Sequence, residues 1–324
     1  MPLDRDSAFL AALGASIAAH IVGAGVAAFV RPELAHAAVI LRDGPVELEW
    51  IDLVDERDVP SEWTWRFRQD LVREAAYAML TDEDRRLGHQ LASQWLVENA
   101  IADPLSLAGH HLAAGELGLA AAALSQAAEQ ALDACDNDAA LRHAERGLEL
   151  ASGVDDAEAP RARLLLAVAE AQRWRGAYAA ALAPARAAVA LLAEGDEPFY
   201  RALGCAIVAA GQTGEASSLD ALLAQLVATP PRDPMAAQLK LIALCRGAHQ
   251  RLGQRRLQDA DALLSRAQTL ARALGEDGPV VAAWLHTTLA ARAHFAGDWV
   301  GYVGGTERAV LDALSHRVPH DLGP

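Results

Sequence analysis

The sequence predicts an all-α fold: a solenoid of stacked helix pairs, preceded by a single apolar amino-terminal helix. The first observation is a recurring unit in which an apolar run rich in Ala and Leu, a glycine-centred break and a second apolar run follow one another. From Gly176 onward the breaks lie about 35 to 45 residues apart, which is the period of stacked helix pairs. The second observation is composition. Hydrophobic residues make up 52% of the 324 residues and aromatic residues only 5%, which favours helices over strands.

Residues 8–30 contain no charged side chain if His20 is neutral, and Arg31-Pro32-Glu33 follows them. A stretch of roughly 20 apolar residues is long enough to span a bilayer as a helix. It is too long for the apolar core of a secretory signal, so we expect a retained anchor. The alternative is a buried core helix, because Ala and Gly are only weakly apolar. Ser16 and His20 lie one helical turn apart on a common face, and polar residues at membrane depth usually find a partner.

Residues 59–104 are predicted to form a helical junction between the anchor and the repeats. Phe67, Leu71, Ala75 and Met79 recur at four-residue spacing, which predicts one buried helix face. Thr81 is followed three residues later by Asp84, a variant of the capping box, so a second helix is predicted to start there.

The helical-repeat solenoid is predicted to occupy residues 105–324, after an anchor and linker over 1–58 and the junction over 59–104. Glycines at its turns permit positive φ and a close approach of helices. Trp174 beside one such glycine is expected to wedge between helices, as are Tyr178 and Trp299. The turn residues are predicted to be Gly115, Gly176, Tyr178, Gly211, Gly253, Gly297 and Trp299. The helices are predicted at 105–114, 117–134, 138–151, 161–175, 178–193, 199–210, 216–228, 234–252, 256–274, 280–296 and 299–315.

Several classes of function are disfavoured by what the chain lacks. The net charge is −15, with 43 acidic against 28 basic residues, which opposes binding to a nucleic-acid backbone. Lys240 is the only lysine and follows no glycine-rich loop, so neither a P-loop nor a kinase lysine is present. We interpret the basic set of Lys240, Arg246, Arg251, Arg255 and Arg256 as a solvated face rather than a docking patch.

Metal and thiol chemistry are also disfavoured. The eleven histidines include no His-Glu-x-x-His, and the adjacent His110 and His111 point about 100° apart on a helix. The three cysteines, Cys135, Cys205 and Cys245, are far apart and are expected to be small buried helix residues. We therefore expect no metal, no cofactor and no catalytic residue, and the chain is not predicted to be an enzyme.

Residues 1–58 resemble the amino-terminal anchor of TonB-type energy-transducer proteins. The likeness rests on Ser16 and His20 within the apolar segment and on the extended segment Val46–Leu53 that follows. It implies that Ser16 and His20 contact a proton-driven motor partner. A structural role, with His20 bonded to a helix carbonyl or a neighbouring helix, is the alternative.

Residues 62–316 resemble the tetratricopeptide-like repeat region of bacterial signal-transduction ATPases of the STAND type, which are often associated with serine/threonine kinases. The likeness rests on Phe-Arg-Gln-Asp-Leu-Val-Arg-Glu-Ala-Ala-Tyr from Phe67 to Tyr77, and it continues through Leu107–His111, Ala127–Leu132 and Ala140–Gly147. In that family the first segment closes a winged-helix subdomain and leads into the repeats. The kinase and ATPase modules themselves are missing, so the resemblance implies an interaction role without catalysis.

We predict a non-catalytic module of a bacterial signalling system that binds a protein or peptide partner on its repeat surface. Arg163, Arg173 and Arg201 are the candidate contacts, because arginines pair with acidic groups of a partner. An alternative is the regulatory segment of a split kinase or ATPase whose catalytic subunit docks near residues 63–99, and another is a fusion of an energy-transducer anchor to repeats. Arg31 and Arg42 after the apolar helix favour a single-pass protein of the cytoplasmic membrane with cytoplasmic repeats, or else a soluble cytoplasmic protein.

Overall fold

A computed structural model describes residues 54–59, 62–67, 74, 77–98, 103–154, 157–275 and 279–315. The predicted anchor, with Ser16 and His20, and the extended segment after it lie outside these residues. Within the described part of the chain, no helix combines the length and the apolar character that crossing a membrane requires.

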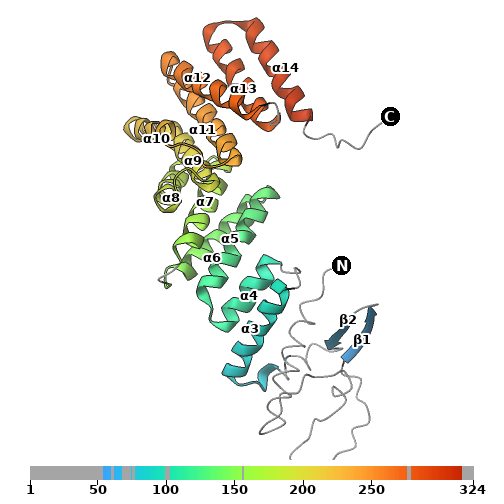
Figure 1. The fold of residues 1–324 in the computed structure, drawn as a ribbon. Helices are drawn as coiled ribbons and strands as arrows, with labels where there is room; N and C mark the ends of the chain where they lie inside the picture. Colours follow the sequence, from blue (N-terminus) through green and yellow to red (C-terminus); the bar gives the residue numbers. More distant parts are fainter. Residues whose placement is uncertain are drawn as a thin grey trace, which may run out of the picture. The chain divides into compact units, whose positions relative to one another are not determined.

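Twelve helices and one two-stranded sheet make up the described residues (Figure 1). The chain divides into two compact units, Met1–Leu124 and Ser125–Pro324, which we call the amino-terminal and carboxyl-terminal units. The elements are β1 Val54–Val59, β2 Glu62–Phe67, α3 Asp82–Glu98, α4 Pro104–Ala114, α5 Leu117–Asp133, α6 Asn137–Ala151, α7 Glu158–Trp174, α8 Tyr178–Leu191, α9 Glu197–Thr213, α10 Ala216–Ala228, α11 Pro234–Gly253, α12 Leu257–Leu274, α13 Pro279–Ala296 and α14 Trp299–Ser315.

The second strand lies within the junction predicted to be helical, and it ends at Phe67, the first residue of the expected helix face. β1 and β2 pair antiparallel, with Val54 opposite Phe67 and Val59 opposite Glu62. Met79, at the other end of the expected helix face, lies in a turn and is 86% exposed. The prediction of one buried helix face is therefore wrong at both of its ends, Phe67 and Met79, whereas Leu71 and Ala75 lie outside the described residues. Between the two ends, Glu74, Tyr77 and Ala78 are helical. Trp63, Trp65 and Phe67 alternate with polar residues, and this period of two is typical of a strand.

Helices α3 and α4 of the amino-terminal unit begin at capping residues. The predicted cap at Thr81 is confirmed: its hydroxyl accepts from the Asp84 backbone N–H at 3.2 Å and donates to the Asp84 carboxylate at 2.6 Å. The Asp103 side chain accepts from the Ser106 N–H at 2.9 Å, and Pro104 fills the first position of α4. α4 ends at Gly115, whose φ of 82° allows the backbone to cap the last carbonyls.

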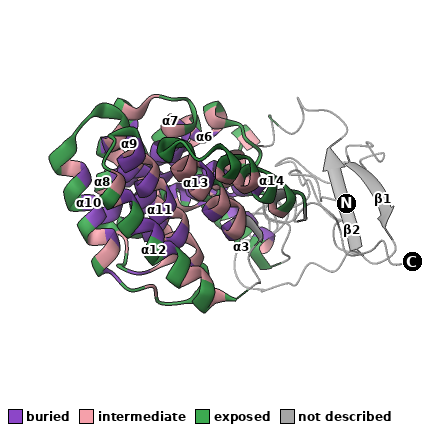
Figure 2. Cartoon of the chain, turned by 90° about the horizontal axis from the view of Figure 1, so that it is seen from above, coloured by how far each residue is buried: buried purple, intermediate pink, exposed green. Residues whose placement is uncertain are grey.

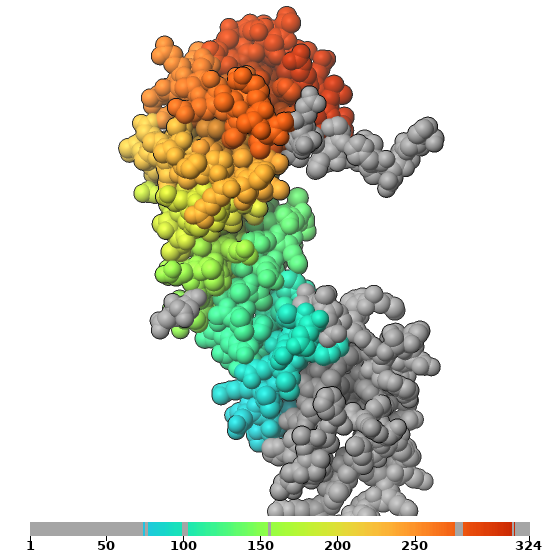
Figure 3. Space-filling view, viewed as in Figure 1, coloured from blue at the N-terminus to red at the C-terminus, as the bar shows by residue number. Residues whose placement is uncertain are grey.

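The carboxyl-terminal unit is a stack of helix pairs, which confirms the helical-repeat prediction at the level of architecture. α7 packs with α8, α9 with α10, α11 with α12 and α13 with α14. The odd-numbered helices α7, α9, α11 and α13 also contact one another in succession. In the space-filling view of this unit the colours follow one another in the order of the sequence, from green to red, because each pair leans on the next (Figure 3).

The core of the unit lies around α9 and α11. Most residues of α9 are buried, including Phe199, Tyr200 and Ile207, and buried residues gather between these helices (Figure 2). Small residues let the helices approach closely. A Cβ at Gly247 of α11 would come within 2.6 Å of the Leu223 side chain of α10. Gly211, a predicted turn residue, lies instead inside α9, where Gln250 of α11 occupies the space of a side chain.

Of the other predicted turn glycines, Gly176 and Gly297 occupy turns between paired helices, as predicted, with φ of 74° and 77°. At the other two breaks a different residue has the positive φ. At the break around Gly211 the left-handed residue is Gly214, with φ of 76°. Gly253 ends α11, and the left-handed residue that follows is Arg255, with φ of 58°.

Two further expectations are wrong in part. Trp174 and Trp299 are 65% and 62% exposed, so neither wedges between helices, whereas Tyr178 is half-buried at the start of α8. Cys205 and Cys245 are buried as predicted. Cys135 is exposed, because it occupies the turn after α5 with φ of 60° rather than a helix.

Candidate partner-binding site

A row of side chains crosses the four odd-numbered helices of the carboxyl-terminal unit. We call it the arginine row, and it consists of Arg173 on α7, Cys205 on α9, Arg246 on α11 and Trp284 on α13. The charges of Arg173 and Arg246 both act on the Cys205 thiol, so Cys205 lies near both guanidinium groups. The carbon Cζ of Arg246 is 5.3 Å from the centre of the Trp284 ring. These side chains can meet because α7, α9, α11 and α13 contact one another in succession.

Glycine at position 204 makes room for this arrangement. A Cβ on Gly204 would lie 2.9 Å from Nη1 of Arg246 and 3.6 Å from the Cβ of Ala243. A glycine and an alanine at this crossing therefore allow the Arg246 guanidinium to extend over α9 beside Cys205. Burial raises the pKa of the Cys205 thiol, so the thiol is neutral and is not a nucleophile.

A closed ion pair lies next to the row. Arg201 of α9 donates to the Glu170 carboxylate of α7 through Nε at 3.2 Å and Nη2 at 2.5 Å. Both side chains are largely buried, with 27% of Arg201 and 11% of Glu170 exposed. Burial lowers the pKa of Arg201, but the charge and hydrogen bonds of Glu170 outweigh it and raise that pKa overall. Arg201 is thus neutralised within the chain.

Arg173 and Arg246 are not neutralised in this way. Among the described residues no carboxylate forms an ion pair with either, and the Nε of Arg173 is buried without a hydrogen-bond partner. Each stacks on an aromatic ring instead, Arg173 at 4.4 Å from the centre of Trp174 and Arg246 on Trp284. Burial lowers the pKa of Arg246, and the Arg173 and Arg201 charges lower it further, against the opposing effects of Cys205 and Glu170. Among the described residues, the row therefore holds two positive charges that no ion pair compensates, although the Arg173 side chain also forms a hydrogen bond with Cys205.

The predicted contact residues occupy three different situations. Arg173 belongs to the row and Arg201 is paired beside it, so the structure brings these two together. Arg163 is exposed on α7, two helical turns before Glu170. Glu170, Arg246 and Trp284 were missed by sequence reasoning. No sequence pattern singles them out, because their positions along α7, α11 and α13 differ and only the packing of the helices brings them together.

The interpretation of the basic set as a solvated face is wrong for two of its members. Only 4% of the Arg251 side chain is exposed, and it pairs with Asp220 of α10. Arg246 is partly buried in the row. Lys240 faces a cavity of about 420 Å³ and donates to the Thr229 carbonyl oxygen at 2.6 Å. Arg255 and Arg256 are exposed, as expected.

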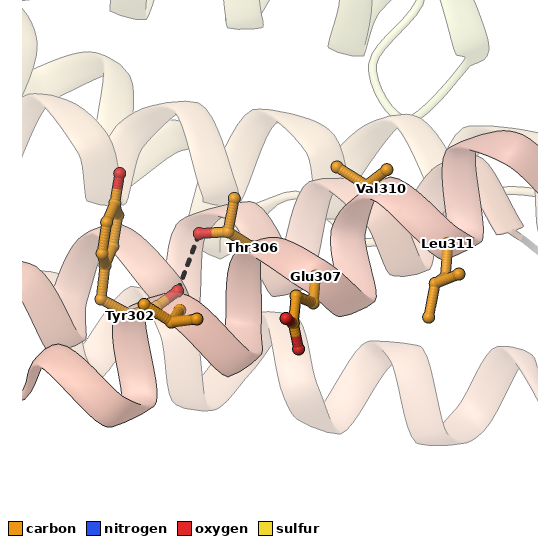
Figure 4. A pocket seen from close by; sticks show the side chains of 6 residues that line it. Tyr302, Thr306, Glu307, Val310 and Leu311 are labelled. Carbon is orange, nitrogen blue, oxygen red and sulfur yellow. Dashed lines mark hydrogen bonds between the residues drawn. The ribbon is translucent and has the colours of Figure 1, made fainter.

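Two other features bear on function without defining a site. On α14, Tyr302, Val303, Val310 and Leu311 expose an apolar surface; all of its lining residues come from this one helix (Figure 4). The Thr306 hydroxyl there donates to the Tyr302 carbonyl oxygen at 2.7 Å.

In the amino-terminal unit two histidines link α3 to α4. The Nδ1 atoms of His89 and His110 are 2.9 Å apart, and Nε2 of His89 is 3.1 Å from the Tyr77 hydroxyl. Burial lowers the pKa of His89, which favours the neutral ring. Within the described residues no three His, Cys, Asp or Glu side chains are grouped so that they could hold a metal ion.

Compared with known proteins, the chain matches no protein-family model and no curated protein.

Proposed function

We propose that the chain is a non-catalytic interaction module that binds an extended peptide segment of a partner protein across α7, α9, α11 and α13. The observation that carries the proposal is the arginine row, because its two arginines without a carboxylate partner lie on α7 and α11, each over an aromatic ring. A ligand that contacts both arginines and also the rings of Trp174 and Trp284 must extend across the stack, and a peptide has the necessary length. Stacks of helix pairs commonly bind partners along such a continuous surface.

The resemblance to signalling ATPases suggests the first partner to test. A kinase or ATPase subunit of the same system would supply the catalytic modules that the resemblance leads one to expect. Its segments are therefore the first peptides to include in a binding screen.

The proposal is tested with the full chain and a library of photo-crosslinkable dodecapeptides that tiles candidate partners and random sequences. We expect tight-binding peptides to crosslink to α7, α9, α11 and α13, as located by mass spectrometry. The even-numbered helices α8, α10 and α12 serve as the internal control. Crosslinks confined to α14 or to the β1–β2 hairpin, or a library without a binder, would contradict the proposal.

A further inference from the structure

We propose that Arg173 and Arg246 form a receptor for carboxylate side chains of the bound peptide, so that the partner segment is acidic. This inference rests on the proposed function and names the chemistry of its partner. Glutamate and aspartate side chains of the segment would lie over Cys205, between the two guanidinium groups.

The hydrogen-bonding state of the arginines supports this assignment. A guanidinium has five N–H donors in a planar fork, and it binds a carboxylate through two parallel hydrogen bonds. Glu170 already uses the fork of Arg201 in this way. No carboxylate among the described residues pairs with Arg173 or Arg246, which lie instead over the rings of Trp174 and Trp284. Arg173 also forms a hydrogen bond with the Cys205 side chain, and its Nε is buried without a partner.

Electrostatics favours an anion at the same place. Arg246 is surrounded by the Arg173 and Arg201 guanidinium groups and by one carboxylate, that of Glu170. Its burial without an equal negative charge disfavours the charged form, and a carboxylate from outside would relieve that cost. A carboxylate is thus bound more strongly here than by exposed arginines, because the site is partly removed from water.

The net charge of the whole chain indicates which kind of anion can bind at the arginine row. A net charge of −15 repels a polyanion such as nucleic acid, since its many phosphates extend beyond the row. A few carboxylates on a peptide that otherwise contacts Trp174 and Trp284 avoid most of that repulsion. The exposed ring of Trp174 and the half-buried ring of Trp284 provide apolar contact on either side of the two arginines.

The experiment starts from the peptides that bind the full chain. We expect Asp and Glu to be enriched among them, and we expect replacement of the critical Glu by Gln in one peptide to weaken binding at least tenfold. The Arg246→Gln and Arg173→Gln variants should lose affinity to a similar extent and should no longer distinguish the Glu peptide from its Gln analogue. Arg186→Gln on α8, an exposed arginine outside the row, is the matched control and should bind like the unmodified chain.

The outcomes separate the inference from the proposed function. Peptides that crosslink to the odd-numbered helices with no preference for acidic residues would overturn the inference and leave the proposed function intact. A library without any binder would overturn both. Complete displacement of the peptide by excess free glutamate or inorganic phosphate, with no contribution from the rest of the peptide, would reassign the row to a small anion and also overturn the inference. Because the Glu-to-Gln change is made in the peptide, the test does not depend on the folding of a protein variant.

Discussion

Helix α11 carries two arginines, five residues apart, whose surroundings differ. Arg251 pairs with Asp220 of α10 and donates to the Gln254 side chain at 2.8 Å. Arg246, in the arginine row, has an aromatic ring and two other guanidinium groups around it. Asp220 thus pairs with the buried Arg251, whereas no carboxylate of the described residues forms an ion pair with Arg246.

We interpret this difference as that between a structural arginine and a binding arginine. Burying a charge is costly unless an opposite charge and hydrogen bonds compensate, so a buried arginine with a partner stabilises the fold. A partly buried arginine without a carboxylate partner costs stability, which is why we propose a binding role for Arg246. One atom of Arg251, Nε, also lacks a partner, but the ends of its fork are bound, so its charge is compensated.

The largest effect on stability is expected at Glu170, the carboxylate that pairs with Arg201 beside the row. Glu170→Gln would leave Arg201 without its ion pair beside two arginines that already lack one. We expect the free energy of unfolding, measured by urea denaturation, to fall by about 3 kcal/mol. Glu149→Gln is the control, because Glu149 forms an exposed pair with Arg146 and should cost less than about 0.5 kcal/mol. Equal effects of the two variants would show that the Glu170 pair does not stabilise the stack.

A smaller loss is expected at Asp220. Asp220→Ala removes the partner of the buried Arg251, and we expect it to lower the free energy of unfolding by about 2 kcal/mol. The loss is smaller than at Glu170 because Asp220 is itself 53% exposed, and water can replace part of the pair. Urea denaturation in parallel with Glu170→Gln gives the ranking, and the reverse order would contradict it.

Arg246→Gln is expected to leave stability nearly unchanged, within about 1 kcal/mol. The variant loses a cation–π contact of about 0.5–1 kcal/mol and gains a similar amount by removing an uncompensated charge. Arg251→Gln on the same helix should cost clearly more, because that side chain is paired. Thermal unfolding of the two variants side by side measures the contrast, and a large loss in Arg246→Gln would place Arg246 among the structural arginines.

The smallest effect on stability is expected from Gly204→Ala. Its new Cβ would displace the flexible end of Arg246, while alanine favours the helix by up to about 1 kcal/mol, so the two terms nearly cancel. Affinity for an acidic peptide should nevertheless fall, because the Arg246 guanidinium group is displaced from its position in the row. Gly109→Ala, where a Cβ meets nothing within 4 Å, is the control and should leave affinity unchanged. Equal affinities of the two variants would argue against the position assigned to Arg246.

The helices of the repeat could be predicted from the sequence because their ends are marked by local chemistry. The helix predicted at 234–252, for example, is Pro234–Gly253, with Asp233 capping its start. The β1–β2 hairpin was missed because only the four-residue spacing that begins at Phe67 was considered. Before it, Trp63, Trp65 and Phe67 alternate with polar residues, and they belong to a strand that pairs with residues 54–59.

The candidate site could be predicted only in part, for a different reason. Periodicity shows which residues share a face of one helix, but not which side chain of the next helix lies opposite. Arg173 and Arg201 were predicted as contacts, yet Glu170 neutralises only one of them. Arg246 and Arg251 were both expected on a solvated face, and only the packing of α11 against α9, α10 and α13 separates their roles.

The most direct test of the account is a double-mutant cycle between Arg246 and the critical glutamate of a bound peptide. Four affinities are measured, with Arg246 or Gln in the chain and Glu or Gln in the peptide. Close charge pairs across interfaces couple by about 1.5 kcal/mol or more, and we predict a coupling of at least that size. A coupling near zero would mean that Arg246 and the acid do not meet, and it would contradict the account.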